Sequence, residues 1–164
     1  VTMPKEVLRL VREYDLSLLD KVYDPWSGTG VISKVLMEYG CSVITNDIHP
    51  SAPAVLHKDA IQLQTYQQWQ ADTGIDAIVT SPHFALLDIA LPMAVRMVKV
   101  AAFIHCPAAY YTDAPDPRWN YFEQLRAQGL LHILWHLPHG PQGRRCIWMC
   151  IFRSPADQQK LARH

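Results

Sequence analysis

The spacing of apolar residues predicts a chain of alternating strands and helices. In residues 4–14, PKEVLRLVREY, apolar side chains at positions 7, 8, 10 and 11 lie between charges, which predicts a short amphipathic helix. Short apolar runs predict seven strands, at residues 21–26, 42–47, 54–60, 76–81, 98–106, 131–138 and 144–154. The longer mixed segments between them predict helices at residues 31–40, 61–70, 85–98 and 119–129.

Glycine and proline indicate where these elements end. Gly40 and Gly129 close two of the helices at C-cap positions, and Pro92 should kink or restart the helix at 85–98. Residues 107–119 hold three prolines, so we expect them to form the longest irregular loop. The tight HGPQG at 139–143 joins the last two strands, which must therefore be antiparallel.

Strands separated by helices favour a parallel sheet covered on both faces. We therefore expect an α/β fold with a seven-stranded, mostly parallel sheet, an antiparallel C-terminal hairpin strand and helices on both faces. The chain should form one domain, with an N-terminal helix in residues 1–20 and a core in residues 21–164. In such folds a ligand binds beyond the carboxyl ends of the strands.

Composition narrows the class of protein. The 164 residues include 15 basic and 15 acidic side chains, so no global field draws the chain to nucleic acid or to an acidic membrane. No apolar stretch reaches the roughly 18 residues that a membrane span needs. Four cysteines lie in or beside apolar segments without a CxxC pair, which indicates reduced thiols and an intracellular protein of the cytoplasm or nucleus. The chain opens at Val1, so we expect a processed product or a domain of a longer protein.

Acidic residues and a glycine turn follow the first three predicted strands. The turn YDPWSGTG, residues 23–30, lets the backbone approach a ligand closely. A dinucleotide site would continue as G-x-G-x-x-G, but the third position is Ser33, and Asp24 would repel a pyrophosphate. Asp47 can take both ribose hydroxyls, and Asp59 can accept from an adenine amino group. The set predicts a site for an adenosine that carries an amino acid and no phosphate, and it disfavours a nicotinamide-dependent oxidoreductase.

The motif DPWSGTG at residues 24–30, together with SPHF at 81–84, resembles the S-adenosylmethionine-dependent methyltransferases of Rossmann-like fold. It resembles in particular their N6-adenine and N4-cytosine branch, whose strand-four motif has the form Asp/Asn/Ser-Pro-Pro-aromatic. The resemblance implies a transferase that uses S-adenosyl-L-methionine, and it extends over nearly the whole chain. The cofactor-binding residues that it implies are Asp24, Pro25, Ser27, Gly28, Gly30, Asp47, Ile48, Asp59 and Ala60.

The same resemblance implies that residues 81–84 bind the substrate. Ser81 and the carbonyl of Pro82 would accept hydrogen bonds from the target amine, and Phe84 would stack on the substrate ring. Two such acceptors favour the pyramidal geometry in which a delocalised nitrogen lone pair attacks, and they stabilise the developing charge. The expected function is thus N-methylation, with a nucleobase amino group in DNA or RNA as the target.

His83 replaces the second proline of that motif, and three alternatives follow. It is a tolerated substitution in an active enzyme, or a mark of an inactive methyltransferase-like module that serves as a scaffold or RNA- or protein-binding subunit, or an active base. A proline there would hold the preceding residue extended and so aim the Pro82 carbonyl. The predicted elements use nearly all residues, so the substrate should be single-stranded or structured nucleic acid, a protein amide, or one presented by a partner domain.

Three other groups are weaker candidates. His132 and His136 share a strand face but lie about 13 Å apart, too far for one ion, so no metal site is predicted. Tyr110, Tyr111 and Trp119 are either a stacking platform for a base or anchors that pack the loop. Arg144 and Arg145 either meet phosphates or form the solvated end of a hairpin.

Overall fold

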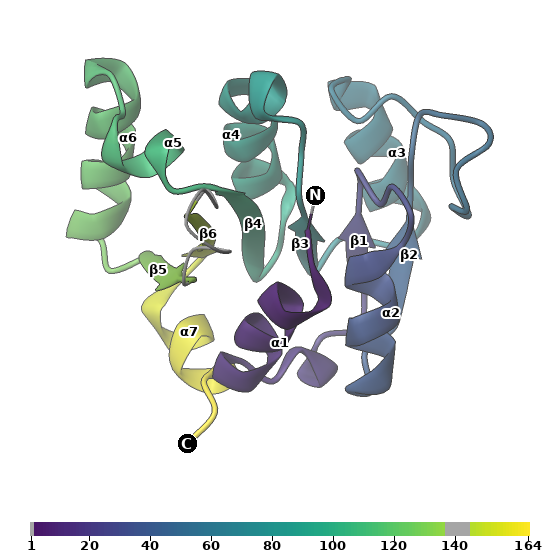
Figure 1. Ribbon diagram of the computed structural model, residues 1–164, viewed down its shortest axis with the longest axis horizontal. Helices are drawn as coiled ribbons and strands as arrows, with labels where there is room; N and C mark the ends of the chain where they lie inside the picture. Colours follow the sequence, from purple (N-terminus) through teal and green to yellow (C-terminus); the bar gives the residue numbers. More distant parts are fainter. Residues whose placement is uncertain (1, 137–144) are drawn as a thin grey trace.

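The computed structural model of the chain describes residues 2–136 and 145–164, and Figure 1 shows their arrangement. The N-terminal half holds α1 (Pro4–Glu13), the 3₁₀ helix η1 (Leu16–Leu18), β1 (Val22–Asp24), α2 (Val31–Glu38), β2 (Val43–Thr45), α3 (Leu63–Asp72) and β3 (Ala77–Thr80). The C-terminal half holds the 3₁₀ helix η2 (Phe84–Leu86), α4 (Leu87–Met97), β4 (Ala101–Pro107), α5 (Ala109–Thr112), α6 (Asp116–Ala127), β5 (Leu131–Trp135), β6 (Cys146–Phe152) and α7 (Pro155–Leu161).

The described strands form one sheet in the order β2-β1-β3-β4-β6-β5. The pairs β1–β2, β1–β3 and β3–β4 are parallel, whereas β6 runs antiparallel to both β4 and β5. The α/β class, the mostly parallel sheet and the antiparallel C-terminal pair are therefore confirmed. The HGPQG link of that pair lies outside the described residues.

The prediction of seven strands was wrong, because residues 54–60 form no strand. Their only ladder contact is an isolated parallel bridge between Leu56 and Asn46. Beyond that bridge, the side chain of Asn46 binds the backbone of Lys58: its Oδ1 accepts from the N–H at 2.8 Å, and its Nδ2 donates to the carbonyl at 3.0 Å. A side chain thus takes the place that a neighbouring strand would have, and the sheet described has six strands.

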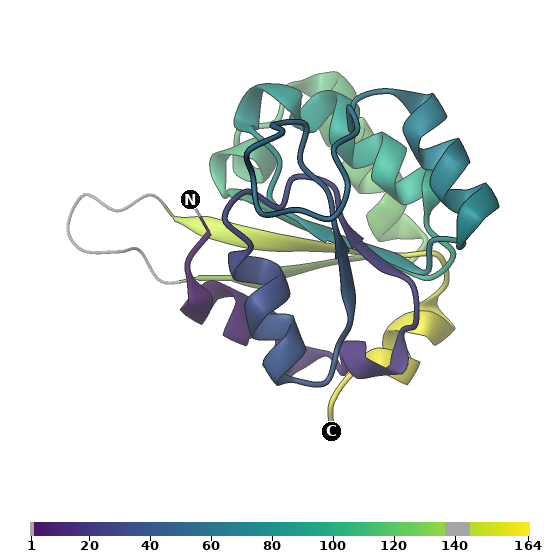
Figure 2. The same ribbon diagram turned by 90° about the vertical axis from the view of Figure 1, so that its right-hand side faces the viewer.

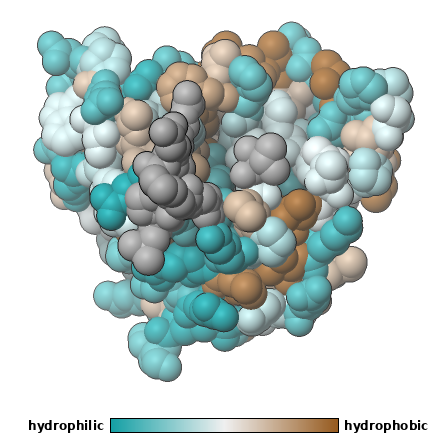
Figure 3. All heavy atoms as spheres, viewed as in Figure 1, coloured by the Kyte–Doolittle hydropathy of each residue, from teal (hydrophilic) through white to brown (hydrophobic). Residues whose placement is uncertain are grey.

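Helices cover both faces of the sheet, as predicted. Buried residues of α3, α4 and α6 pack with Ile78, Ile104 and Met149 on one face. Those of α1, α2 and α7 pack with Phe103 and Trp148 on the other. Figure 2 shows the two helical layers above and below the sheet. Apolar side chains also gather on the surface over α1 and α2 (Figure 3). Leu8 of α1 and Val31 of α2 are partly buried against the core that contains Phe103 and Trp148.

Two further segments differ from the prediction. Residues 107–119 contain α5 and the start of α6 rather than one irregular loop, since Pro115 and Pro117 fall at the N-cap and in the first turn of α6, where a missing N–H does no harm. The sequence pattern also missed α7, which Ser154 caps by accepting from the N–H of Asp157 at 3.2 Å. No disulfide bond joins any of the four cysteines. Among the described residues, no helix combines the length and apolarity that a bilayer crossing requires.

Candidate functional site

A cleft of about 710 Å³ opens at the carboxyl ends of β1, β3 and β4. It lies where ligands bind in open parallel sheets, and its size falls within the roughly 300–1,000 Å³ of small-molecule sites. Three parts of the chain supply most of its lining. They are the turn Trp26, Ser27, Gly28 and Thr29, the motif Ser81, Pro82, His83 and Phe84, and the group Glu6, His105 and Cys146. The two motifs singled out in the sequence therefore face one cleft.

Asp24 ends β1 and is completely buried. Its Oδ1 accepts from the Thr80 hydroxyl at 2.5 Å and from the Trp26 N–H at 3.3 Å. Its Oδ2 has no hydrogen-bond partner among the described residues. Burial raises the pKa of this carboxyl to about 7; the two hydrogen bonds act against that rise, and the charge of Asp47 adds to it. Asp24 is therefore only partly ionised at neutral pH.

The glycine turn is fixed to the end of β2. Ser27 donates its N–H to the Asn46 carbonyl at 3.0 Å, and Gly28 donates its N–H to Asp47 Oδ2 at 3.0 Å. Gly28 and Gly30 have positive φ values, and a Cβ on Gly28 would meet no atom within 4 Å. The hydroxyl of Ser27 is buried without a partner in the described part of the chain. The turn thus presents open backbone and an unused hydroxyl group.

The acids predicted to bind the cofactor differ in what they contact. Asp47 is half-buried, and each of its oxygens accepts one backbone N–H, from Gly28 and from His49. Asp59 instead accepts from the N–H of Ile61 at 3.2 Å, in the turn before α3. Ala60 is buried, and its carbonyl accepts from the Tyr66 hydroxyl; Ile48 is exposed. None of Asp47, Ile48, Asp59 and Ala60 is among the residues that line the cleft.

The motif at residues 81–84 follows β3 directly. Pro82 is buried and Ser81 half-buried, whereas His83 and Phe84 are exposed. His83 has φ −58° and ψ 138°, and its Nδ1 accepts from the Ala85 N–H at 3.3 Å, which caps η2. The Phe84 ring is 53% exposed and meets the Tyr110 ring edge-on at 6.4 Å. His83 therefore holds an extended backbone that a proline could also adopt.

Sequence reasoning missed two polar residues that hold the site together. Thr80 joins the end of β3 to Asp24, and its hydroxyl oxygen also accepts from the Trp26 N–H at 3.2 Å. Asn46 is completely buried and joins the carbonyl of Pro25 to Lys58, which connects the ends of β1 and β2 with the segment before α3. A polar residue at the end of an apolar strand was the available signal, and both positions carry one.

The weaker candidates that the structure describes make contacts within the protein. Tyr110 is buried and donates its hydroxyl to Asp88, which also pairs with Arg118, so this side chain ties α5 to α4. His132 contacts the Tyr14 ring edge-on, and His136 lies beside His105. Arg145 stacks on the Trp135 ring. Arg144 lies outside the described residues.

Comparison with known proteins identifies the fold of the chain but no family to which it belongs. No family model and no curated protein matches the sequence. Among solved structures, the chain is similar to a type I restriction-modification methyltransferase subunit of Streptococcus thermophilus, with a TM-score of 0.64 and 11% identity over 92% of this chain. The chain spans 44% of that subunit.

Two smaller proteins align over most of their own length. An O-methyltransferase of Bacillus cereus, solved with SAH, has a TM-score of 0.62 and 11% identity, covering 93% of this chain and 82% of that one. The rRNA methyltransferase AviRa of Streptomyces viridochromogenes has a TM-score of 0.56 and 11% identity, covering 96% and 85%. The chain thus has the Rossmann-like α/β fold of methyltransferases. Because the matched proteins include different kinds of methyltransferase, the fold does not single out the amino-methylating branch.

Proposed function

We propose that this protein is an S-adenosylmethionine-dependent N-methyltransferase whose target is an amino group of a nucleobase in DNA or RNA. The observation that carries the proposal is the shared cleft: the turn Ser27–Thr29 and the motif Ser81–Phe84 both line it, at the carboxyl ends of the parallel strands. A methyl donor held by the first motif would therefore face an acceptor held by the second.

The residues present fit such a cofactor. Asp24 Oδ2 and Ser27 Oγ are buried in the same turn without hydrogen-bond partners among the described residues, and an unmade bond of this kind costs about 1–3 kcal/mol. Gly28 leaves open space where a side chain would stand. Asp47 uses one acceptor position on each oxygen, so each oxygen keeps another for a ribose hydroxyl. The cofactor would supply a methyl group on a sulfonium centre.

The chain's own residues then have distinct roles in the proposal. Asp24, Ser27 and the Gly28–Gly30 backbone, after Pro25, hold the amino acid part of the cofactor, and Asp47 holds the ribose. Asp59 and Ala60, with Ile48, would border the adenine. Because these three residues do not line the cleft, the adenine would have to extend beyond it to reach them.

On the substrate side, Ser81 and the carbonyl of Pro82 accept the N–H bonds of the target amine, and Phe84 offers its exposed face to the base. Base stacking on such a ring is worth about 1–3 kcal/mol. Nucleic acid that is single-stranded or structured suits this arrangement, with a partner domain or subunit supplying further recognition.

Cofactor binding provides the first test. Calorimetry with S-adenosylhomocysteine should show one site in the wild type and at least tenfold weaker binding in Gly28→Ala. Gly74→Ala is the matched control: Gly74 also has positive φ and open space around its Cβ, but it lies between α3 and β3, at the amino end of the strand. Equal loss in both variants would contradict the proposed place of the cofactor. No binding by the wild type would contradict the proposal as a whole and favour the inactive module.

The target group needs a second experiment. Methyl-labelled cofactor is incubated with single-stranded DNA or RNA, and the digested nucleosides are separated. Label in N-methylated adenine or cytosine is the expected result. Label on ribose oxygen alone would refute the amino-group target while leaving methyl transfer intact.

A further inference from the structure

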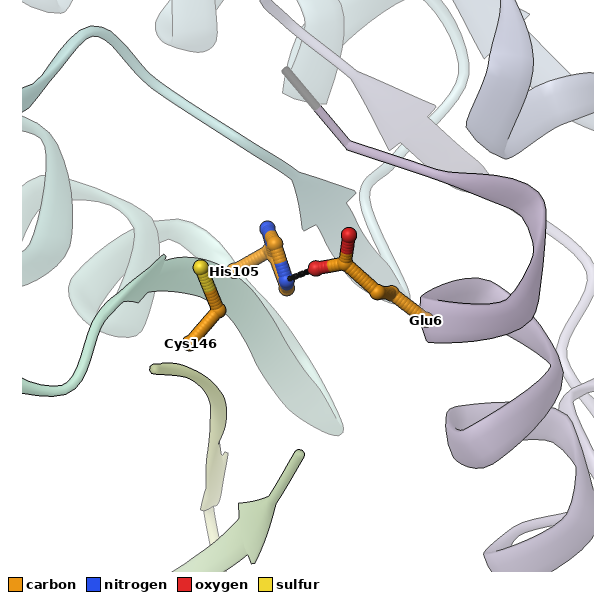
Figure 4. Close-up of side chains that lie close together, drawn as sticks. All are labelled: Glu6, His105 and Cys146. Carbon is orange, nitrogen blue, oxygen red and sulfur yellow. Dashed lines mark ion pairs between the residues drawn. The ribbon is translucent and has the colours of Figure 1, made fainter. Parts of the chain in front are cut away.

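Three side chains of the kinds that bind metal ions meet at one side of the cleft. Glu6 of α1, His105 of β4 and Cys146 at the start of β6 point toward one another in Figure 4. Their ligand atoms all lie within 4.8 Å of one another. Glu6 and His105 are buried, Cys146 is half-buried, and all three line the cleft. Neither the cofactor nor the substrate roles proposed above use any of them.

The sheet register accounts for their convergence. In the β4–β6 pair, His105 lies opposite Trp148 and Pro107 lies opposite Cys146. Because side chains alternate along a strand, His105 and Cys146 project from the same face. Trp148 packs with α1 on that face, so the first turn of α1 brings Glu6 to the pair. Cys106 projects from the opposite face, into the other core.

Neighbouring groups already orient the ligand atoms. Glu6 accepts the Met3 N–H on Oε1 at 3.1 Å, and its Oε2 pairs with His105 Nε2. The other ring nitrogen, Nδ1, lies 3.3 Å from the Thr2 hydroxyl. A metal-binding histidine commonly has its second nitrogen bonded to an oxygen in this way, which fixes both the tautomer and the ring orientation.

We propose that Glu6, His105 and Cys146 bind a divalent transition-metal ion, with zinc the best match. Carboxylate, imidazole and thiolate together suit Zn²⁺. Ligand atoms of a tetrahedral zinc ion stand about 3.3–3.8 Å apart, and the three atoms here all lie within 4.8 Å of one another. Because Glu6 Oε2 contacts His105 Nε2 directly, these two atoms would move apart to admit the ion. The carboxylate and the thiolate would neutralise the ion in a buried place. Three protein ligands would leave the fourth coordination position of the ion open toward the cleft, for water or another ligand atom. The proposal is independent of the methyltransferase function, because the ion can be measured without cofactor or substrate.

Metal binding to the full chain tests this directly. Protein stripped with a chelator should bind one equivalent of Zn²⁺ in competition with a chromophoric chelator. With Co²⁺ it should show a thiolate-to-cobalt charge-transfer band. Cys146→Ser should abolish that band and weaken Zn²⁺ binding by more than about 100-fold, and Thr2→Val should weaken it by about 10–100-fold.

Cys41→Ser is the control, because Cys41 likewise forms no disulfide but precedes β2, an edge strand three places from β4 in the sheet. It should leave the zinc affinity and the cobalt band unchanged. His105→Gln should lose zinc affinity as Cys146→Ser does. Zinc binding that survives both of these changes, or no zinc binding by the wild type, would overturn the proposal and leave the Glu6–His105 contact as an ion pair only. Circular dichroism of each metal-free variant checks whether a loss of zinc affinity comes from unfolding.

Discussion

Replacing Asp24 with asparagine should stabilise the protein at pH 8 much more than at pH 5. Asn has nearly the same shape, and its Oδ1 can still accept from Thr80 and from the Trp26 N–H. What it removes is the ionisable group that the fold buries completely. The change therefore isolates the effect of burying this charge.

The sign follows from the two pKa values of Asp24. Burial raises the pKa to about 7 in the folded protein, from 3.8 in a model peptide. Between these values the folded protein keeps a proton that the unfolded chain has released, so the free energy of unfolding falls as pH rises. The loss is complete above pH 7 and amounts to about 4 kcal/mol in all. About 3 kcal/mol of it falls between pH 5 and pH 8.

Urea unfolding of both proteins at pH 5 and pH 8 measures the effect. The variant should gain about 3 kcal/mol on the wild type between the two pH values. Any fixed penalty, such as an amide group without a partner beside Thr80, cancels in this difference. Asp72→Asn is the control, because Asp72 is an exposed acid that accepts from Gln68 on the surface of α3. It should show no comparable gain.

A gap between wild type and Asp24→Asn that is equal at the two pH values would refute the reasoning, since the carboxyl would then titrate alike in both states. If the variant instead lost stability relative to the wild type from pH 5 to pH 8, the pKa of Asp24 would be lowered by folding rather than raised. The proposed cofactor role makes a linked demand: the variant should bind S-adenosylhomocysteine more weakly at pH 8, although it is more stable there. Greater stability with weaker binding is the expected behaviour of a site residue.

Two further changes concern the substrate side of the cleft. His83→Pro should fold and should raise the rate of methyl transfer, because φ of −58° already suits proline and the new ring would restrict Pro82; circular dichroism and turnover measure this, and a slower folded variant would mean that the imidazole has its own role. Phe84→Ala should raise KM for a nucleic acid about 5–150-fold while leaving the affinity for S-adenosylhomocysteine unchanged. A kinetic titration with a calorimetric control checks it, and an unchanged KM would exclude stacking on this ring.

The apolar pattern predicted the strands well where both faces are buried. Residues 77–80 and 101–106 are buried at every position, and such runs are clear in the sequence. The segment 54–60 was mistaken because its pairing depends on the side chain of Asn46, which lies at least eight residues away along the chain. Hydrogen bonding by a distant side chain leaves no mark on the local pattern.

Some residues of the candidate site could likewise be recognised from the sequence, and others could not. The motifs at residues 26–29 and 81–84 could be recognised in the sequence, and the order of the strands brings both to the carboxyl ends of β1 and β3, where they line one cleft. Asp24 could be recognised as an acid at a strand end, but not as a buried one with an altered pKa. Glu6 and His105 are separated by most of the chain and carry no motif, so only the register of β4 with β6 and the docking of α1 show that they meet.

The contact between Asp24 and Thr80 explains why the two halves of the cleft should act together. Thr80 immediately precedes Ser81, and its hydroxyl is bound to the carboxyl that ends β1. A ligand ammonium group that ionised Asp24 would strengthen this hydrogen bond, because a charged acceptor binds a hydroxyl more tightly than a neutral one. The end of β3, and with it the start of the SPHF motif, would then be held more firmly when the cofactor side of the cleft is filled. Thr80→Val should therefore weaken the binding of S-adenosylhomocysteine and also raise KM for the nucleic acid. Phe84→Ala should raise KM alone.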